Sequence, residues 1–191
     1  MSTITVVAKD GFAAIAADSL ITWGSTGKDG PDYIVNHSKI MRCGGSYLGI
    51  SGSTAAMLAL KRYFNSMGDP DLSTIDRIFE TWLKLHLALR DEYFLNPKES
   101  TKDAFESSRI DVLIANENGI FGVDGHRAVQ QFSKYYSYGT GSQHALGAMY
   151  AAYSQPNPSA EDIAKLGVQA AAEFDLDTGL PIISYALRLR R

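Results

Sequence analysis

The 191 residues, 45% of them hydrophobic and 20% charged, suffice for one well-filled core but not for two typical domains, so we expect one domain over residues 1–191. A formal net charge of -3 gives no reason to expect nucleic acid or anionic lipid as a partner. With no secretion signal, no apolar run of roughly 18 residues and a single cysteine, Cys43, the sequence predicts a cytoplasmic protein without a membrane span.

Residues 2–19 predict a β-hairpin at the start of the chain. Two short strands of β-branched and small apolar residues flank a turn at residues 9–11, and its Asp-Gly pair is a strong hairpin signal. The first strand starts at Ser2. If Met1 is removed, the chain begins with a hydroxyl residue that carries a free α-amine, which places a nucleophile and a base on one residue.

The rest of the first half predicts two strands followed by two helices. Glycines and a proline mark an irregular loop at residues 25–36. A hydroxyl residue at position 53 or 54 can cap the first helix, and Gly68 ends it. The expected elements are strands near residues 33–42 and 46–51, a helix from residue 53 or 54 to Gly68, and a helix at about 73–94.

The second half repeats this order. It predicts three strands and a fourth that runs into Gly139, then two helices, the second of which begins with a capping signature at residues 159–162. The expected boundaries are strands at 109–115, 119–124 and 129–132, helices at 143–154 and 159–174, and a final strand at 182–187. This order predicts an α+β fold in which two antiparallel sheets lie between two helix layers, although other α+β folds share it.

Five stretches, in order and at nearly the right spacing, resemble the proteasome β-subunits and HslV, the bacterial protease of the same family. They are residues 2–19, 37–40, 48–55, 138–141 and 175–179. In that family the mature chain starts at a threonine, turns at a glycine and reaches an aspartate at the end of the second strand. Counted from Ser2, the glycine and the aspartate of this chain fall in register, whereas counted from Thr3 they are one residue out. The resemblance implies the N-terminal-nucleophile hydrolase fold, a four-layer αββα sandwich.

Cleavage of an amide needs a nucleophile, a base that takes its proton, and donors aimed at the developing oxyanion. Ser2 would supply the nucleophile, and its α-amine, which ordinarily titrates at about 7.7 to 8.0, would act as the base. The resemblance implies that Lys39 places a cation beside the Ser2 hydroxyl and that Asp18 holds this lysine. Apolar neighbours along both strands predict a buried pair, with a solvated surface pair as the alternative.

A glycine is expected to donate its N–H to the oxyanion, because a side chain would obstruct the close approach of the backbone. Gly49 and Gly52 both qualify, and the spacing does not choose between them. The resemblance also implies that Thr140, Asp175 and Thr178 surround the terminal amine; helix and turn capping is the alternative role. Four residues are expected from their position to line a specificity pocket: Ile21, His37, Met41 and Ser51.

The resemblance therefore predicts an HslV-type peptidase that uses Ser2 to cleave peptide or unfolded protein substrates inside a homo-oligomeric ring, with an ATP-dependent unfoldase as a partner. Two other functions stay open: an amidohydrolase for small amides with the same fold, and a noncatalytic scaffold subunit that retains Met1. The four histidines show no metal-ligand spacing, so we expect neither a metal nor a cofactor.

Overall fold

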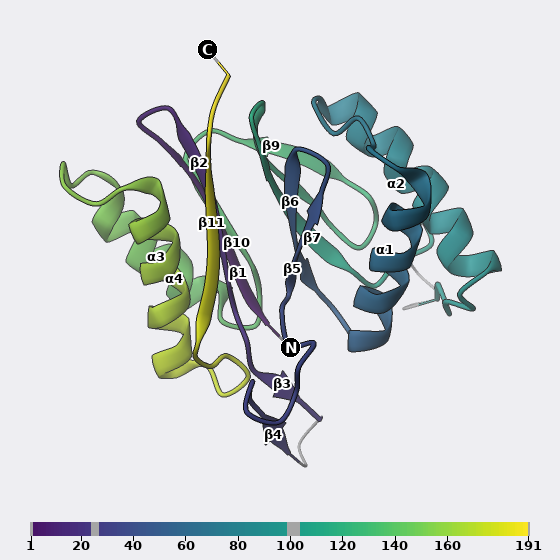
Figure 1. Ribbon diagram of the computed structural model, residues 1–191, viewed down its shortest axis with the longest axis horizontal. Coiled ribbons are helices and arrows are strands. Elements are labelled where there is room, and N and C mark those ends of the chain that lie inside the picture. Colours follow the sequence, from purple (N-terminus) through teal and green to yellow (C-terminus); the bar gives the residue numbers. More distant parts are fainter. Residues whose placement is uncertain (1, 24–26, 99–103, 191) are drawn as a thin grey trace.

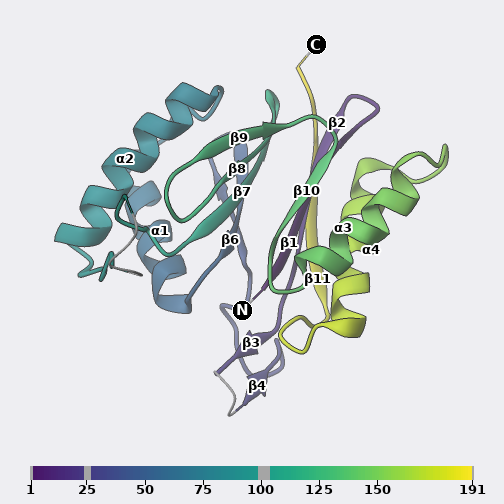
Figure 2. The ribbon, with the colours of Figure 1, turned by 180° about the vertical axis from the view of Figure 1, so that it is seen from behind.

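A computed structural model of the chain describes residues 2–23, 27–98 and 104–190 (Figure 1). Two antiparallel sheets face each other, and each has a pair of helices on its outer side, so that the molecule has four layers. Figure 2 shows the same layers from behind. The helices are Thr54–Met67 (α1) and Ile75–Asp91 (α2) on one flank, and Ser142–Tyr153 (α3) and Ala160–Phe174 (α4) on the other. The predicted α+β sandwich is confirmed.

The first sheet contains the N-terminal hairpin. Its strands, in spatial order, are Tyr135–Gly139 (β10), Thr3–Lys9 (β1), Phe12–Asp18 (β2) and Ile182–Arg188 (β11). The turn predicted at residues 9–11 is a two-residue turn between β1 and β2, and both of its residues have positive φ, 52° at Asp10 and 79° at Gly11. Turns with two positive φ angles match the twist of the flanking strands. The hairpin therefore places Ser2 and Asp18 at the same end of the sheet.

The second sheet faces the hairpin from the other half of the sandwich. Its strands, in spatial order, are Ile40–Cys43 (β5), Ser46–Ser51 (β6), Asp111–Asn116 (β7), Gly119–Val123 (β8) and Val129–Phe132 (β9). The chain leaves β6 through Gly52, and Ser53 then caps α1 by accepting the N–H of Ala56 at 3.1 Å. Ser159 and Asp162 form the predicted capping box at the start of α4. No helix in the described part of the chain has the length and apolar character needed to cross a bilayer.

Apolar contacts between the sheets position the two halves of the molecule. Ile4 of β1 and Ile15 of β2 lie in one buried cluster with Leu113 of β7 and Ile120 of β8. Side chains alternate between the faces of a strand, so the neighbouring Thr5 turns to the helix side and donates its hydroxyl to a carbonyl of α4. The sheets thus close on each other along the strand that begins after Ser2.

The segment that leads into β5 differs from the sequence prediction. A strand is predicted over residues 33–42, but only its last part, from Ile40, is extended in the sheet. Two short strands that the sequence does not predict, Ile21–Thr22 (β3) and Lys28–Asp29 (β4), pair with each other before it. The backbone N–H groups at positions 33 and 34 bond to the carbonyl of Gly30, which makes turns in place of a ladder. Residues 25 and 26 of the predicted loop lie outside the described residues.

Candidate active site

Ser2 lies immediately before β1, and the neighbouring strand β10 holds its backbone. The Ser2 carbonyl accepts a hydrogen bond from the N–H of Thr140 at 3.0 Å. The preceding Gly139 pairs with Thr3 and has a φ of +104°, and a Cβ there would lie well under 3.0 Å from the Ser2 carbonyl oxygen. A glycine is required at this point because the two backbones approach so closely. Ser2 itself is only 2% exposed.

Asp18 and Lys39 form a buried ion pair that joins the two sheets. Asp18 ends β2, Lys39 immediately precedes β5, and the Lys39 Nζ lies 2.8 Å from the Asp18 Oδ1. The two side chains are 0% and 1% exposed respectively, which rules out a solvated surface pair. Backbone N–H groups also donate to the Asp18 carboxylate: those of Thr3 at 3.0 Å, Leu20 at 3.1 Å and Gly179 at 3.2 Å. A buried charge needs such pairing and hydrogen bonding to persist.

The burial of Lys39 changes its proton affinity. Burial lowers the pKa of Lys39, while the charge and the hydrogen bond of Asp18 act in the opposite direction. Lys39 is therefore easier to deprotonate than a surface lysine, although Asp18 keeps it in position. A cation held in a poorly solvated site can stabilise negative charge that develops on a neighbouring oxygen.

A second carboxylate cluster adjoins Ser2 from the other side of the sheet. Asp175 caps the C-terminus of α4, and its Oδ2 accepts the hydroxyls of Thr140 at 2.7 Å and Thr178 at 2.6 Å. Burial raises the pKa of Asp175, but its hydrogen-bond donors, chiefly the Thr178 and Thr140 hydroxyls and then the Asp177 backbone, together hold the pKa below its usual value. The structure thus assembles the three predicted residues, and Thr140 links them to the Ser2 carbonyl through its N–H.

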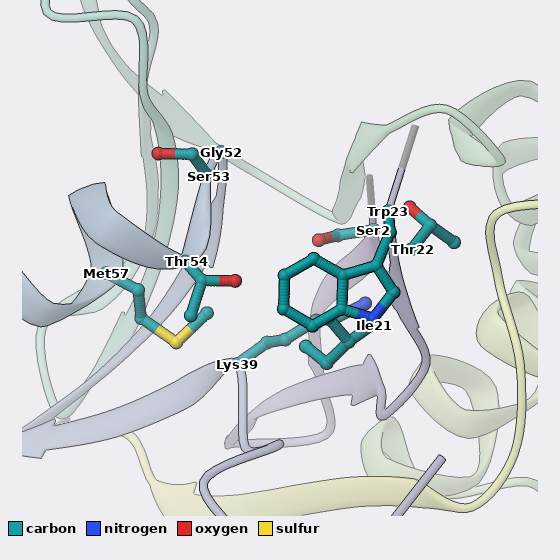
Figure 3. Close-up of a pocket in the computed structure, with 9 residues that line it drawn as sticks. All are labelled: Ser2, Ile21, Thr22, Trp23, Lys39, Gly52, Ser53, Thr54 and Met57. Carbon is teal, nitrogen blue, oxygen red and sulfur yellow. The ribbon is translucent and has the colours of Figure 1, made fainter. Parts of the chain in front are cut away.

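A cavity of about 500 Å³ opens beside Ser2 (Figure 3). Lys39 and Gly52 line it together with Ser2. Gly49 does not line it, because Gly49 lies in β6 between the sheets, where a Cβ would come within 2.5 Å of the Ile4 side chain. The geometry therefore distinguishes the two glycines: one borders the cavity beside the hydroxyl, and the other allows the sheets to pack.

The remaining walls of the cavity differ from the prediction. Of the four residues expected to line a pocket, Ile21 does so. The prediction for Met41 is wrong, because this side chain is buried between the second sheet and its helices. The prediction for His37 is also wrong: its ring bonds instead to the carbonyl of Ile34 at 2.9 Å. The prediction for Ser51 is wrong as well, since the cavity is bordered not by Ser51 but by the residues that follow it, 52–54. The residues that the sequence analysis missed are Thr22, Trp23, Ser53, Thr54 and Met57.

The missed residues come from two segments. Figure 3 shows Thr54 and Met57 on one side of the cavity and Thr22 and Trp23 on the other. Thr54 and Met57 are three residues apart at the start of α1, so helical periodicity combined with the preceding Gly52 would have indicated them. The indole of Trp23 donates to the Asp29 carboxylate at 2.7 Å across β3 and β4, and no sequence pattern predicted that pairing.

Among residues 2–23, 27–98 and 104–190, no group of three or more His, Cys, Asp or Glu side chains is placed to hold a metal ion. The buried His86 instead contacts two oxygens, with its Nδ1 2.9 Å from the Ser108 hydroxyl and its Nε2 3.0 Å from the Glu106 carboxylate. These contacts tie the segment after residue 103 to α2. None of the three residues in these contacts lines the cavity beside Ser2.

The four-layer sandwich of two antiparallel sheets between two helix layers is the fold of the N-terminal-nucleophile hydrolases. Ser2 lies before an inner strand of one sheet, and Lys39, which borders the same cavity, lies before a strand of the other. No protein-family model matches the chain. Among solved structures, the chain is similar to the BPH protein of Thiobacillus denitrificans in complex with epoxomicin. The two share 52% identity with a TM-score of 0.93, over 99% of this chain and 100% of the other.

Two further structures give the same result at different levels of sequence identity. A second structure of the Thiobacillus denitrificans protein is 53% identical with a TM-score of 0.93, over 98% of each chain. The eukaryotic HslV from Trypanosoma brucei shares 18% identity with a TM-score of 0.75, over 97% of this chain and 99% of the other, and is alike in fold. The chain belongs to the proteasome β-subunit and HslV-like family.

Proposed function

We propose that this chain is an HslV-type peptidase whose nucleophile is the Ser2 hydroxyl after removal of Met1. The observation that carries the proposal is that Ser2, Lys39 and Gly52 border one cavity while β10 holds the Ser2 backbone. The epoxomicin complex of the 52% identical relative supports a hydrolase of this class.

In the proposed reaction, the Ser2 Oγ attacks the carbonyl carbon of a peptide bond, and the α-amine of Ser2 takes the hydroxyl proton. Lys39 stabilises the negative charge on Oγ, and the N–H of Gly52 donates to the oxyanion of the tetrahedral intermediate. The C–N bond then breaks, the amine passes its proton to the leaving nitrogen, and an ester to Ser2 remains. Water hydrolyses the ester with the amine again as the base, which frees Ser2.

We propose that the Asp175 cluster holds the terminal amine during these steps. Asp175 is a charged acceptor on which the Thr140 and Thr178 hydroxyls are aligned, and Thr140 also bonds to the Ser2 carbonyl. A carboxylate near the amine favours its protonated form and so makes the amine a stronger base toward the Ser2 hydroxyl. Capping alone would require no contact with Ser2.

The assembly is part of the proposal. We propose that each copy forms one domain over residues 1–191 and that copies form a cytoplasmic ring that acts on peptides or unfolded proteins with an ATP-dependent unfoldase. The family resemblance supports the ring and the unfoldase. Contacts between subunits are supported by a stripe of apolar side chains at four-residue spacing along α2, each at least 42% exposed: Ile75, Phe79, Leu83 and Leu87.

The proposed nucleophile is tested by the intact mass of protein from its native host before and after treatment with epoxomicin, a peptide epoxyketone. Such a probe joins an N-terminal hydroxyl and its amine in one ring, so it reports both groups together. We expect a chain that begins at Ser2 and gains one stoichiometric adduct. Ser2→Ala, which keeps the amine and removes the hydroxyl, is expected to gain none. A mass with Met1 intact and no adduct would leave the noncatalytic scaffold as the better function.

The cavity predicts a preference for apolar side chains next to the cleaved bond. Its walls include Ile21, Trp23 and Met57, and the charged Lys39 among its lining residues is already paired with Asp18. Among the described residues that line it, none has a carboxylate to receive a basic side chain. Fluorogenic peptides with leucine or methionine before the scissile bond are therefore expected to have a kcat/KM at least about tenfold above that of the arginine peptide.

A variant at the start of α1 tests which wall controls this preference. Thr54→Asp introduces a carboxylate into the cavity, and the first turn of a helix tolerates acidic residues well. We expect this variant to favour the arginine peptide. Ala55→Asp is the matched control, because Ala55 is in the same helical turn, is exposed and does not border the cavity. Equal selectivity in wild type and Thr54→Asp would show that substrates bind elsewhere.

A further inference from the structure

Thr3 makes two hydrogen bonds to different parts of the site. The residue is fully buried. Its backbone N–H donates to Asp18 Oδ1 at 3.0 Å, and its Oγ1 lies 2.6 Å from the Oγ1 of Thr178. Asp18 belongs to the ion pair with Lys39, and Thr178 belongs to the Asp175 cluster. Thr3 therefore connects the two clusters, directly after the proposed nucleophile.

The hydroxyl of Thr3 is the donor in its bond to Thr178. Thr178 has one hydroxyl proton and donates it to Asp175 Oδ2 at 2.6 Å. The Thr140 hydroxyl donates to the same oxygen at 2.7 Å, as expected for an ionised carboxylate, which accepts only. The Thr3 proton is therefore directed at the Thr178 oxygen, and the two hydroxyls form a chain that ends at Asp175. Neighbouring bonds in such a chain polarise and strengthen each other.

The Thr3 hydroxyl depends on a glycine beside it for space. A Cβ on Gly141 would lie under 3.0 Å from both the Thr3 Oγ1 and the Ala171 side chain. Gly141 therefore provides the space in which the hydroxyl reaches Thr178. Ala171 belongs to α4, and the acceptor Asp175 caps the C-terminus of that helix. The packing of α4 and the hydrogen bonds of the two hydroxyls therefore both position the Asp175 carboxylate.

We propose that Thr3 is a positioning residue for the Ser2 nucleophile: it ties the buried ion pair to the Asp175 cluster and, through Thr178, keeps the Asp175 carboxylate in place. The inference rests on the proposed function, because it assigns Thr3 a part in the reaction of Ser2. Thr3 does not border the cavity beside Ser2. Its loss is therefore expected to change the rate of reaction rather than the binding of substrate.

Thr3→Val keeps the shape of the side chain and removes the hydroxyl. In the protein that begins at Ser2, we expect the maximal rate of epoxomicin adduct formation to fall about tenfold or more, because Thr178 loses its donor. The epoxomicin concentration that gives half of the maximal rate is expected to stay unchanged. The acid limb of the pH profile, which the Ser2 α-amine sets as the proposed base, is expected to move to lower pH, since a displaced Asp175 carboxylate favours the protonated amine less. Thr3→Ser retains the hydroxyl and is expected to react within about threefold of wild type.

Thr5→Val is the matched control. Thr5 is on the same strand and the same face, is fully buried, and donates its hydroxyl to the carbonyl of Ala164 at 2.8 Å. The control therefore loses a buried hydrogen bond of the same kind outside the site. We expect it to melt at a lower temperature than wild type and to react at the wild-type rate with the wild-type pH profile.

The outcomes separate this inference from the proposed function. If wild type fails to react with epoxomicin, the proposed function is wrong. If wild type reacts and Thr3→Val matches it, or if Thr3→Ser is as slow as Thr3→Val, the role of the Thr3 hydroxyl is overturned. Thr3→Ala against Thr3→Ser repeats the comparison without the methyl group if the valine variant does not fold. Loss of folding in both variants without the hydroxyl would assign Thr3 to the fold and also overturn the proposal.

Discussion

Replacing Asp18 by asparagine is expected to lower the free energy of unfolding by about 3–5 kcal/mol and to stop the reaction with epoxomicin. Asp18 is the partner of the buried Lys39, at 2.8 Å. The variant leaves the lysine ammonium in the core without a counter-charge, which makes a broken buried pair much less stable than an intact one. The amide nitrogen of asparagine cannot accept a hydrogen bond, so the N–H of Thr3 or of Gly179 also loses its acceptor.

Urea unfolding at one fixed protein concentration measures this change, since assembly would make stability depend on concentration. Asp71→Asn is the matched control because Asp71 is exposed and accepts hydrogen bonds from Ser73, two residues further on; its unfolding midpoint is expected to stay at the wild-type value. Adding Lys39→Met to Asp18→Asn removes the unpaired charge and is expected to recover part of the stability but not the reaction. Wild-type stability in Asp18→Asn would contradict the importance of the buried pair.

Replacing Gly139 by alanine is expected to lower the free energy of unfolding by at least about 3 kcal/mol and to abolish the epoxomicin adduct, although no side chain of the site is altered. Gly139 has a φ of +104°, which side chains disfavour. The added Cβ would also meet the Ser2 carbonyl carbon and oxygen well within 3.0 Å, and backbone atoms cannot rotate away as a flexible side chain can. Either β10 or Ser2 must move, which breaks the bond from the Thr140 N–H to the Ser2 carbonyl.

Gly147→Ala separates this effect from a general response to glycine replacement. Gly147 is exposed within α3, and a Cβ there would have no neighbour within 4 Å. Alanine at this position is expected to stabilise the protein by up to about 1 kcal/mol through its higher helix propensity, with the epoxomicin reaction unchanged. Thermal unfolding and intact mass report both effects. A Gly139→Ala protein that forms the adduct at the wild-type rate would show that the close contact with Ser2 is dispensable.

Turns and helix starts could be predicted because residues close along the chain determine them. Asp10 and Gly11 tolerate the positive φ angles that their turn requires, and the Ser53 and Ser159 hydroxyls accept the N–H three residues further on. The same local logic fails over residues 33–39, which the sequence predicts as a strand. The N–H groups of residues 33 and 34 bond within a turn to the carbonyl of Gly30, and no alternation of side chains reveals such a turn.

The sequence by itself determined the hairpin, the helix starts and the order of strands and helices along the chain, because these depend on local spacing; the family resemblance added the layers and the candidate Ser2. The tertiary structure alone decided that Gly52 rather than Gly49 borders the cavity, and that Met57 rather than Met41 lines it. It also decided the hydroxyl contact between Thr3 and Thr178, which are 175 residues apart. These contacts form when the two sheets close on each other and bury their apolar faces, so they depend on packing between distant segments that spacing in one sequence does not record.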